Sequence, residues 1–226
     1  MKLKSIKTIL IVCALPIALT SCEVFGLDLQ EPYEYDYEIG MADNHVYMST
    51  YEFIESRTDI FSKLKDAIDY AGLEEQFKQG GCTYILPTNN AFDPESENSY
   101  VYHNQLSYYD EEEDTIVYYA PTSLTVYSKE QIKEFLLYHI VKGKYTFTNL
   151  SAEPTWYDTY ATADTAKVNM YLYKDRNPNI TFNNFDGHYL TSIKPRTANL
   201  YSSDGAYIHV LDNWLDRPTR SQINLE

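Results

Sequence analysis

The spacing of apolar residues changes along this chain, and that change limits the folds it can adopt. Up to about residue 143, apolar residues recur at three- and four-residue intervals, as on one face of an α-helix. Later, Val168, Met170 and Leu172 alternate with more polar neighbours, which is the period of a strand. Helices followed by strands predict an α+β domain. Because no internal repeat is present, one domain is favoured over two.

Three helices are expected in the first part of the chain. Ser56 or Thr58 should cap the first helix, which ends before Gly72, and Ser128 with Gln131 forms a capping-box pattern at the start of the third. The expected elements are a helix over 58–71, a short helix over 73–79, a strand over 82–86, a hairpin with a strand over 116–119, a helix from 129 to Gly143, and strands over 168–172, 180–185, 189–193 and 206–211.

The first 21 residues are typical of a bacterial lipoprotein signal peptide. Three lysines lie within the first seven positions, and residues 8–19 form an apolar stretch that is too short to span a bilayer. This stretch ends in Leu19-Thr20-Ser21-Cys22, which resembles a lipobox. We therefore expect cleavage after residue 21 and acylation of Cys22, with fatty acids such as palmitate. The mature protein would be anchored at the outer membrane and face the cell exterior.

Cysteine usage predicts that the apolar core alone holds the fold. Cys13 would leave with the signal peptide and Cys22 would carry lipid, so Cys82 has no partner for an intrachain disulfide. Cys82 precedes the predicted buried strand and lacks a basic neighbour that would lower its pKa. We expect it to be a small core residue.

The charge balance excludes some classes of partner. The chain has 18 basic and 33 acidic residues and a net charge of −15; losing the three lysines of the signal leaves 15 basic residues and a net charge of −18. Such a surface repels nucleic acid and anionic lipid head groups. Residues 22–48, rich in acids and tyrosine, are expected to form an extended tether. Residues 49–216 would form the domain, and residues 217–226 a polar tail.

No residue pattern predicts catalysis, a metal or a cofactor. The sequence contains no G-x-S-x-G, no H-E-x-x-H and no glycine-rich phosphate loop, and its five histidines show no zinc-ligand spacing. The acidic run Asp110–Asp114 lacks the glycine of a calcium loop and is expected to be a solvated hairpin tip. We expect the protein not to be an enzyme.

Three segments, in this order, resemble the fasciclin (FAS1) domain family. They are Thr83–Phe92 (TYILPTNNAF), Leu136–Tyr145 (LLYHIVKGKY) and Gly205–Leu215 (GAYIHVLDNWL). The resemblance spans about Tyr51 to Leu215, with a longer, tyrosine-rich segment before Ser128 and a loose match over 151–204. It implies a single wedge-shaped domain, a β-sandwich with several packed helices. It also implies a mostly non-enzymatic role in adhesion and extracellular recognition.

The resemblance implies a non-catalytic, cell-surface binding or adhesion lipoprotein of the Bacteroidetes type that recognises a glycan or a surface protein. The alternative is a structural accessory subunit docked on an outer-membrane glycan-uptake transporter, since such lipoproteins resemble components of those systems. Every sequence feature described above is compatible with both alternatives.

Four groups of residues are candidates for a role. Residues 100–127 are rich in tyrosine. Where two adjacent tyrosines lie in one strand, one ring should pack inward and the other point out. Tyr138, His139 and His209 lie in the family segments and are expected to be structural. The candidates are Cys22 for lipidation; Tyr108, Tyr109, Tyr118 and Tyr119 for binding; Tyr138, His139 and His209 for structure; and Thr115 and Thr165, in acid-Thr-apolar triplets similar to a Bacteroidetes O-glycosylation motif.

Overall fold

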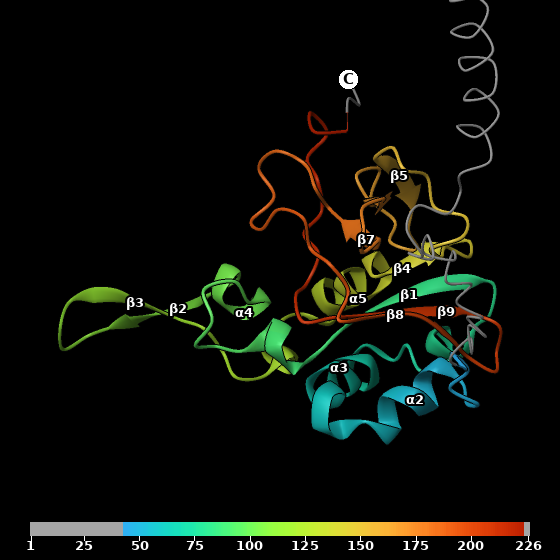
Figure 1. Ribbon diagram of the computed structural model, residues 1–226. Coiled ribbons are helices and arrows are strands. Elements are labelled where there is room, and N and C mark those ends of the chain that lie inside the picture. Colours follow the sequence, from blue (N-terminus) through green and yellow to red (C-terminus); the bar gives the residue numbers. More distant parts are fainter. Residues whose placement is uncertain (1–42, 224–226) are drawn as a thin grey trace, which may run out of the picture. The chain divides into compact units, whose positions relative to one another are not determined.

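A four-stranded sheet lies between helices on one side and a three-stranded sheet on the other (Figure 1). The structure is a computed structural model that describes residues 43–223. The central sheet has the order β4 (Ile140–Lys142), β1 (Cys82–Pro87), β9 (Tyr207–Leu211) and β8 (Thr197–Tyr201). The second sheet has the order β5 (Thr155–Asp158), β6 (Lys167–Tyr173) and β7 (Asn179–Phe182).

The remaining elements are helices and one hairpin. The α-helices are α2 (Thr50–Ser56), α3 (Thr58–Ala71), α4 (Tyr100–His103) and α5 (Lys129–Tyr138); the 3-10 turns are η1 (Gln76–Lys78), η2 (Asn89–Phe92) and η3 (Leu124–Val126); and the hairpin pairs β2 (Leu106–Asp110) with β3 (Thr115–Tyr119). The α+β prediction is therefore confirmed. Within residues 43–223, no helix has the length and apolar character needed to cross a bilayer.

Helix α3 forms where its apolar spacing predicts it. Phe61, Leu64 and Ile68 are buried on one face, and Gly72 ends the helix in the left-handed conformation at φ +68°. The predicted caps are wrong, because Ser56 closes the preceding helix and its hydroxyl donates to the carbonyl of Phe53. The short helix expected over 73–79 is a single 3-10 turn.

Helix α2 was not expected, although its start carries a clear signal. The Ser49 hydroxyl accepts from the backbone N–H of Glu52, and the Glu52 carboxylate accepts from the backbone N–H of Ser49. This reciprocal capping box satisfies two backbone donors at the helix end.

Helix α5 begins at the predicted cap but ends earlier than expected. Ser128 accepts from the backbone N–H of Gln131, whereas the Gln131 side chain donates to the Tyr100 hydroxyl. The chain leaves the helix at His139 rather than Gly143, because Ile140 and Val141 form the edge strand β4, antiparallel to β1. Pairing with the sheet therefore replaces the last predicted turn of helix.

The central pair of strands, β1 and β9, is parallel and almost fully buried. Thr83 lies opposite Tyr207, and Pro87 opposite Leu211. Strand β9 lies within its predicted segment, β1 runs one residue beyond its predicted end, and Cys82 is buried in the core as expected. This pairing brings the first and third family segments side by side.

The remaining strand predictions succeeded in part. Strand β6 contains the predicted 168–172, and β7 ends at Phe182 because Asn183 adopts a left-handed φ of +45°. The segment 189–193 is not a strand, and it contacts the sheet through one bridge between Ile193 and Phe182. Strands β5 and β8 were not predicted.

Both ends of the described chain lie against the domain. The Val46 N–H donates to the Tyr201 carbonyl, and the Tyr201 N–H donates to the Asn44 carbonyl, so residues 43–48 belong to the domain rather than to a tether. The Gln222 side chain donates to the Asp186 carbonyl, so the expected polar tail packs as far as residue 223. The expected signal peptide, Cys22 and residues 22–42 lie outside the described residues.

Candidate functional site

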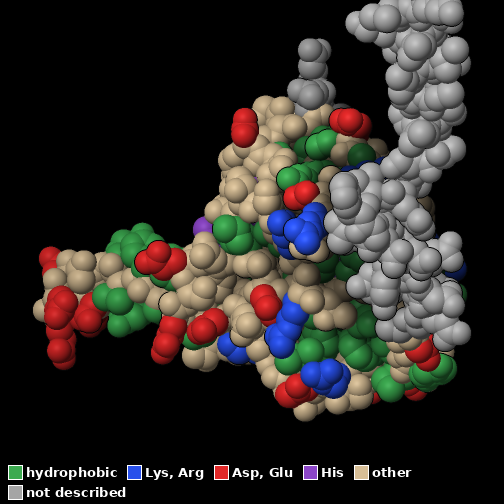
Figure 2. Space-filling view, in the orientation of Figure 1, with side chains coloured by type: hydrophobic (Ala, Val, Ile, Leu, Met, Phe, Trp, Pro, Cys, Tyr) green, Lys and Arg blue, Asp and Glu red, His purple; other side chains and the backbone are tan. Residues whose placement is uncertain are grey.

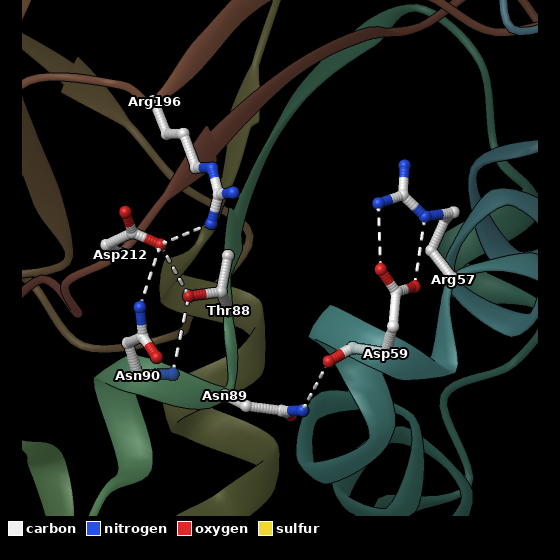
Figure 3. A network of polar contacts seen from close by, with 7 residues as sticks. All are labelled: Arg57, Asp59, Thr88, Asn89, Asn90, Arg196 and Asp212. Carbon is white, nitrogen blue, oxygen red and sulfur yellow. Dashed lines mark hydrogen bonds and ion pairs between the residues drawn. The ribbon is translucent and has the colours of Figure 1, made fainter.

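A polar network joins the first and third family segments (Figure 3). One carboxylate oxygen of Asp212 accepts from the Thr88 hydroxyl at 2.9 Å and from the Asn90 side-chain amide at 3.3 Å. The Arg196 guanidinium lies 3.4 Å from the same oxygen. The Thr88 N–H also donates to the Leu211 carbonyl at 2.8 Å. These contacts fasten the turn after β1 to the end of β9.

The neighbouring Asn89 fastens the same turn to helix α3. Its amide nitrogen donates to the Ser62 hydroxyl at 3.0 Å, and its oxygen accepts from the backbone N–H of Lys63 at 3.0 Å. Asp59, whose carbonyl also accepts from Asn89, forms a two-point ion pair with Arg57 (Figure 3). The polar residues of the first segment therefore link the turn after β1 to helix α3 and to the end of β9 by hydrogen bonds.

His139 is buried with both ring nitrogens occupied. The Leu215 N–H donates to Nε2 at 3.0 Å, so the proton lies on Nδ1, which donates to the Phe135 carbonyl at 2.8 Å. Burial lowers the pKa of His139 to about 4. His209 is bonded in the same manner: its Nδ1 accepts from the Asn199 N–H, its Nε2 donates to the Tyr145 carbonyl, and burial lowers its pKa to about 4.

Tyr138 is also enclosed. Its hydroxyl lies 3.0 Å from the Lys167 carbonyl and 3.2 Å from the Asp216 carbonyl, and it accepts from the Asn183 amide. The tyrosine–histidine pair thus holds the segment 215–216 against α5. Both rings are buried.

The β2–β3 hairpin projects away from the rest of the domain (Figures 1 and 2). Its four candidate tyrosines have 44–64% of their surface exposed. Tyr108 and Tyr119 contact each other on one face, and Tyr109 and Tyr118 lie on the opposite face according to the strand register. The expectation of one inward ring in each pair is wrong, because all four rings are exposed.

The tip of the hairpin is acidic. Asp110 accepts from the backbone N–H groups of Glu112 and Glu113, and Asp114 accepts from the Tyr109 hydroxyl. The Asp110 contacts shape a tight turn whose carboxylates face solvent (Figure 2).

A cavity of about 280 Å³ opens between α4, α5 and the segment 214–217. Its lining combines buried aromatic rings with exposed polar side chains. The residues are Tyr100, His103, Asn104, Gln131, Phe135, Tyr138, Trp214, Leu215, Asp216 and Arg217. We call it the Trp214 pocket. It was not predicted, because its lining comes from three segments that are distant in the sequence.

The fasciclin domain model matches residues 59–217 of this chain. The chain belongs to the fasciclin domain family. Its fold is similar to the FAS1 domain pair of the insect cell adhesion molecule fasciclin I, with a TM-score of 0.50 and 14% identity, covering 78% of this chain and 53% of that one. The chain therefore spans about half the length of that structure. No curated protein sequence matches it.

Within this fasciclin domain, the hairpin lies between the first two family segments. The two glycosylation candidates differ in access. Thr115 is exposed at the start of β3, whereas Thr165 is half-buried beside Ala166. Their modification stays a prediction.

The fasciclin domain offers no metal site among its described residues. Across residues 43–223, no three His, Cys, Asp or Glu side chains are placed to hold a metal ion. The family is associated with cell adhesion, and a non-catalytic adhesion role fits the domain.

Proposed function

We propose that this protein is a non-catalytic adhesion module, held at the outer face of the cell by a lipid on Cys22, and that it binds a surface protein through the β2–β3 hairpin. The observation that carries the proposal is the exposure of apolar rings on both faces of the hairpin. An isolated two-stranded hairpin is marginally stable in water, so a partner that covers it would stabilise it.

The side chains of the hairpin suit a protein interface. Tyrosine provides a rigid apolar face and a hydroxyl at little cost in conformational entropy, and it is enriched at interfaces. Ile116, 56% exposed, adds an aliphatic contact between the rings. Because the hairpin is a convex projection, it fits a groove on a protein better than it fits a small ligand, which is usually held in a concave site.

The acidic tip defines the charge of the partner. The five residues Asp110–Asp114 present negative charge beside the apolar rings. A partner with a basic rim around an apolar groove would be attracted by long-range electrostatics and aligned on contact. The alternative, an accessory subunit docked permanently on an outer-membrane glycan-uptake transporter, would use the same hairpin.

Site-specific photo-crosslinking in native cells tests the hairpin. A photoreactive amino acid at Tyr118 or Tyr109 should capture the same protein, and Glu111→Lys with Glu112→Lys and Glu113→Lys should abolish the capture. A matched probe at Tyr173, a half-exposed ring on β6, is the control. Capture of that protein equally from Tyr173, or capture unaffected by the charge reversal, would contradict the proposal.

Metabolic labelling tests the anchor independently. A clickable palmitate should label the wild-type protein and not the Cys22→Ala variant, because only a thiol at this position can accept the diacylglycerol. Equal labelling of the two proteins would contradict the anchor and leave the hairpin proposal standing.

A further inference from the structure

We propose that the Trp214 pocket binds one ring of a neutral sugar. The pocket is separate from the hairpin, so this inference goes beyond the proposed adhesion to a protein. It rests on three features of the pocket: a rigid aromatic floor, a polar rim, and a backbone clamp that fixes the rim.

The floor of the pocket is aromatic and preorganised. The rings of Tyr100 and Phe135 lie 4.5 Å apart, and the Trp214 ring meets Tyr100 edge-on at 5.3 Å. Trp214 is also supported by Tyr189, stacked at 4.7 Å with an interplanar angle of 10°. All four rings are buried or nearly so. An apolar surface held by such packing can receive the C–H face of a sugar ring without losing side-chain freedom.

The rim of the pocket carries hydrogen-bonding groups of both kinds. Gln131 donates its amide to the Tyr100 hydroxyl at 3.0 Å, which directs that oxygen as an acceptor. Burial raises the pKa of Tyr100, so the hydroxyl keeps its proton at neutral pH. Among residues 43–223, no acceptor lies within hydrogen-bond reach of that proton. The hydroxyl is therefore a donor available to a ligand.

Asp216 and Arg217 add an acceptor and a donor beside each other. Both side chains are exposed at the mouth of the pocket. A sugar hydroxyl both donates and accepts, so two adjacent hydroxyls match a neighbouring carboxylate and guanidinium.

The backbone at Asp216 is clamped, which fixes the position of the rim. Its N–H donates to Nε2 of His188 at 3.1 Å, and its carbonyl accepts from the Tyr138 hydroxyl and the Asn183 amide. Leu215 is held by His139 in the same way. The family's tyrosine–histidine pair thus acts as a positioning element for the rim, while the Asp216 carboxylate stays exposed.

Charge and size limit the ligand. Glu134 lies 3.5 Å from the Arg217 guanidinium and offsets its charge, and the whole chain carries a net charge of −15. An anionic sugar would be repelled. The cavity volume of about 280 Å³ lies just below the usual range for ligand sites. A single neutral ring is therefore the occupant that fits.

Saturation-transfer NMR on the full chain tests the proposal. The probes are the methyl glycosides of glucose, galactose, mannose, xylose and N-acetylglucosamine, with N-acetyl-lysine amide as a probe for a peptide side chain. At least one glycoside should receive saturation, and Asp216→Asn and Gln131→Ala should each weaken its binding about tenfold. In a Trp156→Phe background, the same glycoside should change the fluorescence of Trp214.

A hairpin variant separates this test from that of the adhesion proposal. Tyr118→Ala should leave glycoside binding unchanged, whatever it does to the partner protein. The Asp216 side chain is exposed, so Asp216→Asn should keep the wild-type melting temperature. Gln131→Ala removes the hydrogen bond to the buried Tyr100 hydroxyl and should lower the melting temperature, so binding is compared well below the melting temperatures of all variants. If Asp216→Asn unfolds, Gln131→Ala decides. Transfer to none of the glycosides, transfer that is equal in wild type and rim variants, or transfer to the lysine probe alone would overturn the proposal.

Discussion

The ring of His139 connects helix α5 to the segment after β9 by two buried hydrogen bonds. His139→Ala would leave the Phe135 carbonyl and the Leu215 N–H without the partner that the ring supplies. Each unpaired buried group costs about 1–3 kcal/mol, so the free energy of unfolding should fall by at least that amount. Urea denaturation of the variant measures the change.

His45→Ala is the matched control, because the His45 side chain is 50% exposed and its ring bonds to the nearby Asp43. Its unfolding free energy should stay within about 0.5 kcal/mol of wild type. An unchanged stability for His139→Ala would show that the fold does not depend on this ring.

At the scale of elements, the turn before β1 packs tightly on the turn before β9. A Cβ at Gly80 would lie 1.8 Å from the Asp204 carbonyl oxygen, whereas a Cβ at Gly81 would meet nothing within 4 Å. Gly80→Ala must push the two turns apart and should cost about 3 kcal/mol. Gly81→Ala has room but keeps a φ of +80°, so strain alone should cost about 1–2 kcal/mol.

Thermal unfolding of the two variants compares a steric clash with backbone strain at adjacent positions. Gly80→Ala should have the lower melting temperature. A lower melting temperature for Gly81→Ala would mean that the turn at 202–206 deforms easily and that the contact between Gly80 and Asp204 does not hold β1 against β9.

The sequence predicted those elements whose spacing of apolar residues matches the side chains that are buried in the structure. Helix α3, helix α5 and strands β1 and β9 belong to this group. The strand predicted at 189–193 does not form, because Tyr189 stacks on Trp214 instead of joining a sheet. Strand β8 was not predicted. Asn199, at φ +60°, lies where the register of β8 with β9 shifts, and this shift interrupts the alternation of side chains along β8.

The candidate sites depend more on tertiary structure. The sequence predicted a tyrosine-rich hairpin with an acidic tip, but it could not show that both faces would stay uncovered. The Trp214 pocket forms where residues 100–104, 131–138 and 214–217 come together in the fold, and no local sequence pattern predicts that these segments are neighbours. The buried position of His139 was foreseeable, because its spacing from Phe135 and Leu136 predicts that it faces inward.

At the scale of the whole molecule, buried neutral histidines should make stability depend on pH. Burial lowers the pKa of His139 and of His209 to about 4, and it also lowers that of His188. Between about pH 6.5 and pH 4 the unfolded chain binds protons that the folded chain excludes, so stability is complete above this window and falls through it. Each of the two most shifted rings accounts for on the order of 3 kcal/mol.

Urea denaturation at pH 7.5, 5.5 and 4.5 measures this loss. His209→Gln should reduce the slope of unfolding free energy against pH, since one titrating group is gone from both states. An unfolding free energy that is the same at pH 7.5 and pH 4.5 would show that the buried rings gain protons without opening the fold.

The parallel pairing of β1 with β9 also sets the order in which the chain can fold. Thr83 meets Tyr207 across roughly 120 intervening residues, so the contact order is high and closure of this loop is entropically costly before any contact offsets it. Strand β1 can form its antiparallel contact with β4 earlier, but its other edge stays open until β9 is in place. Folding should therefore be slow, and a chain shortened before residue 207 would expose a strand edge that favours aggregation over a partly folded domain.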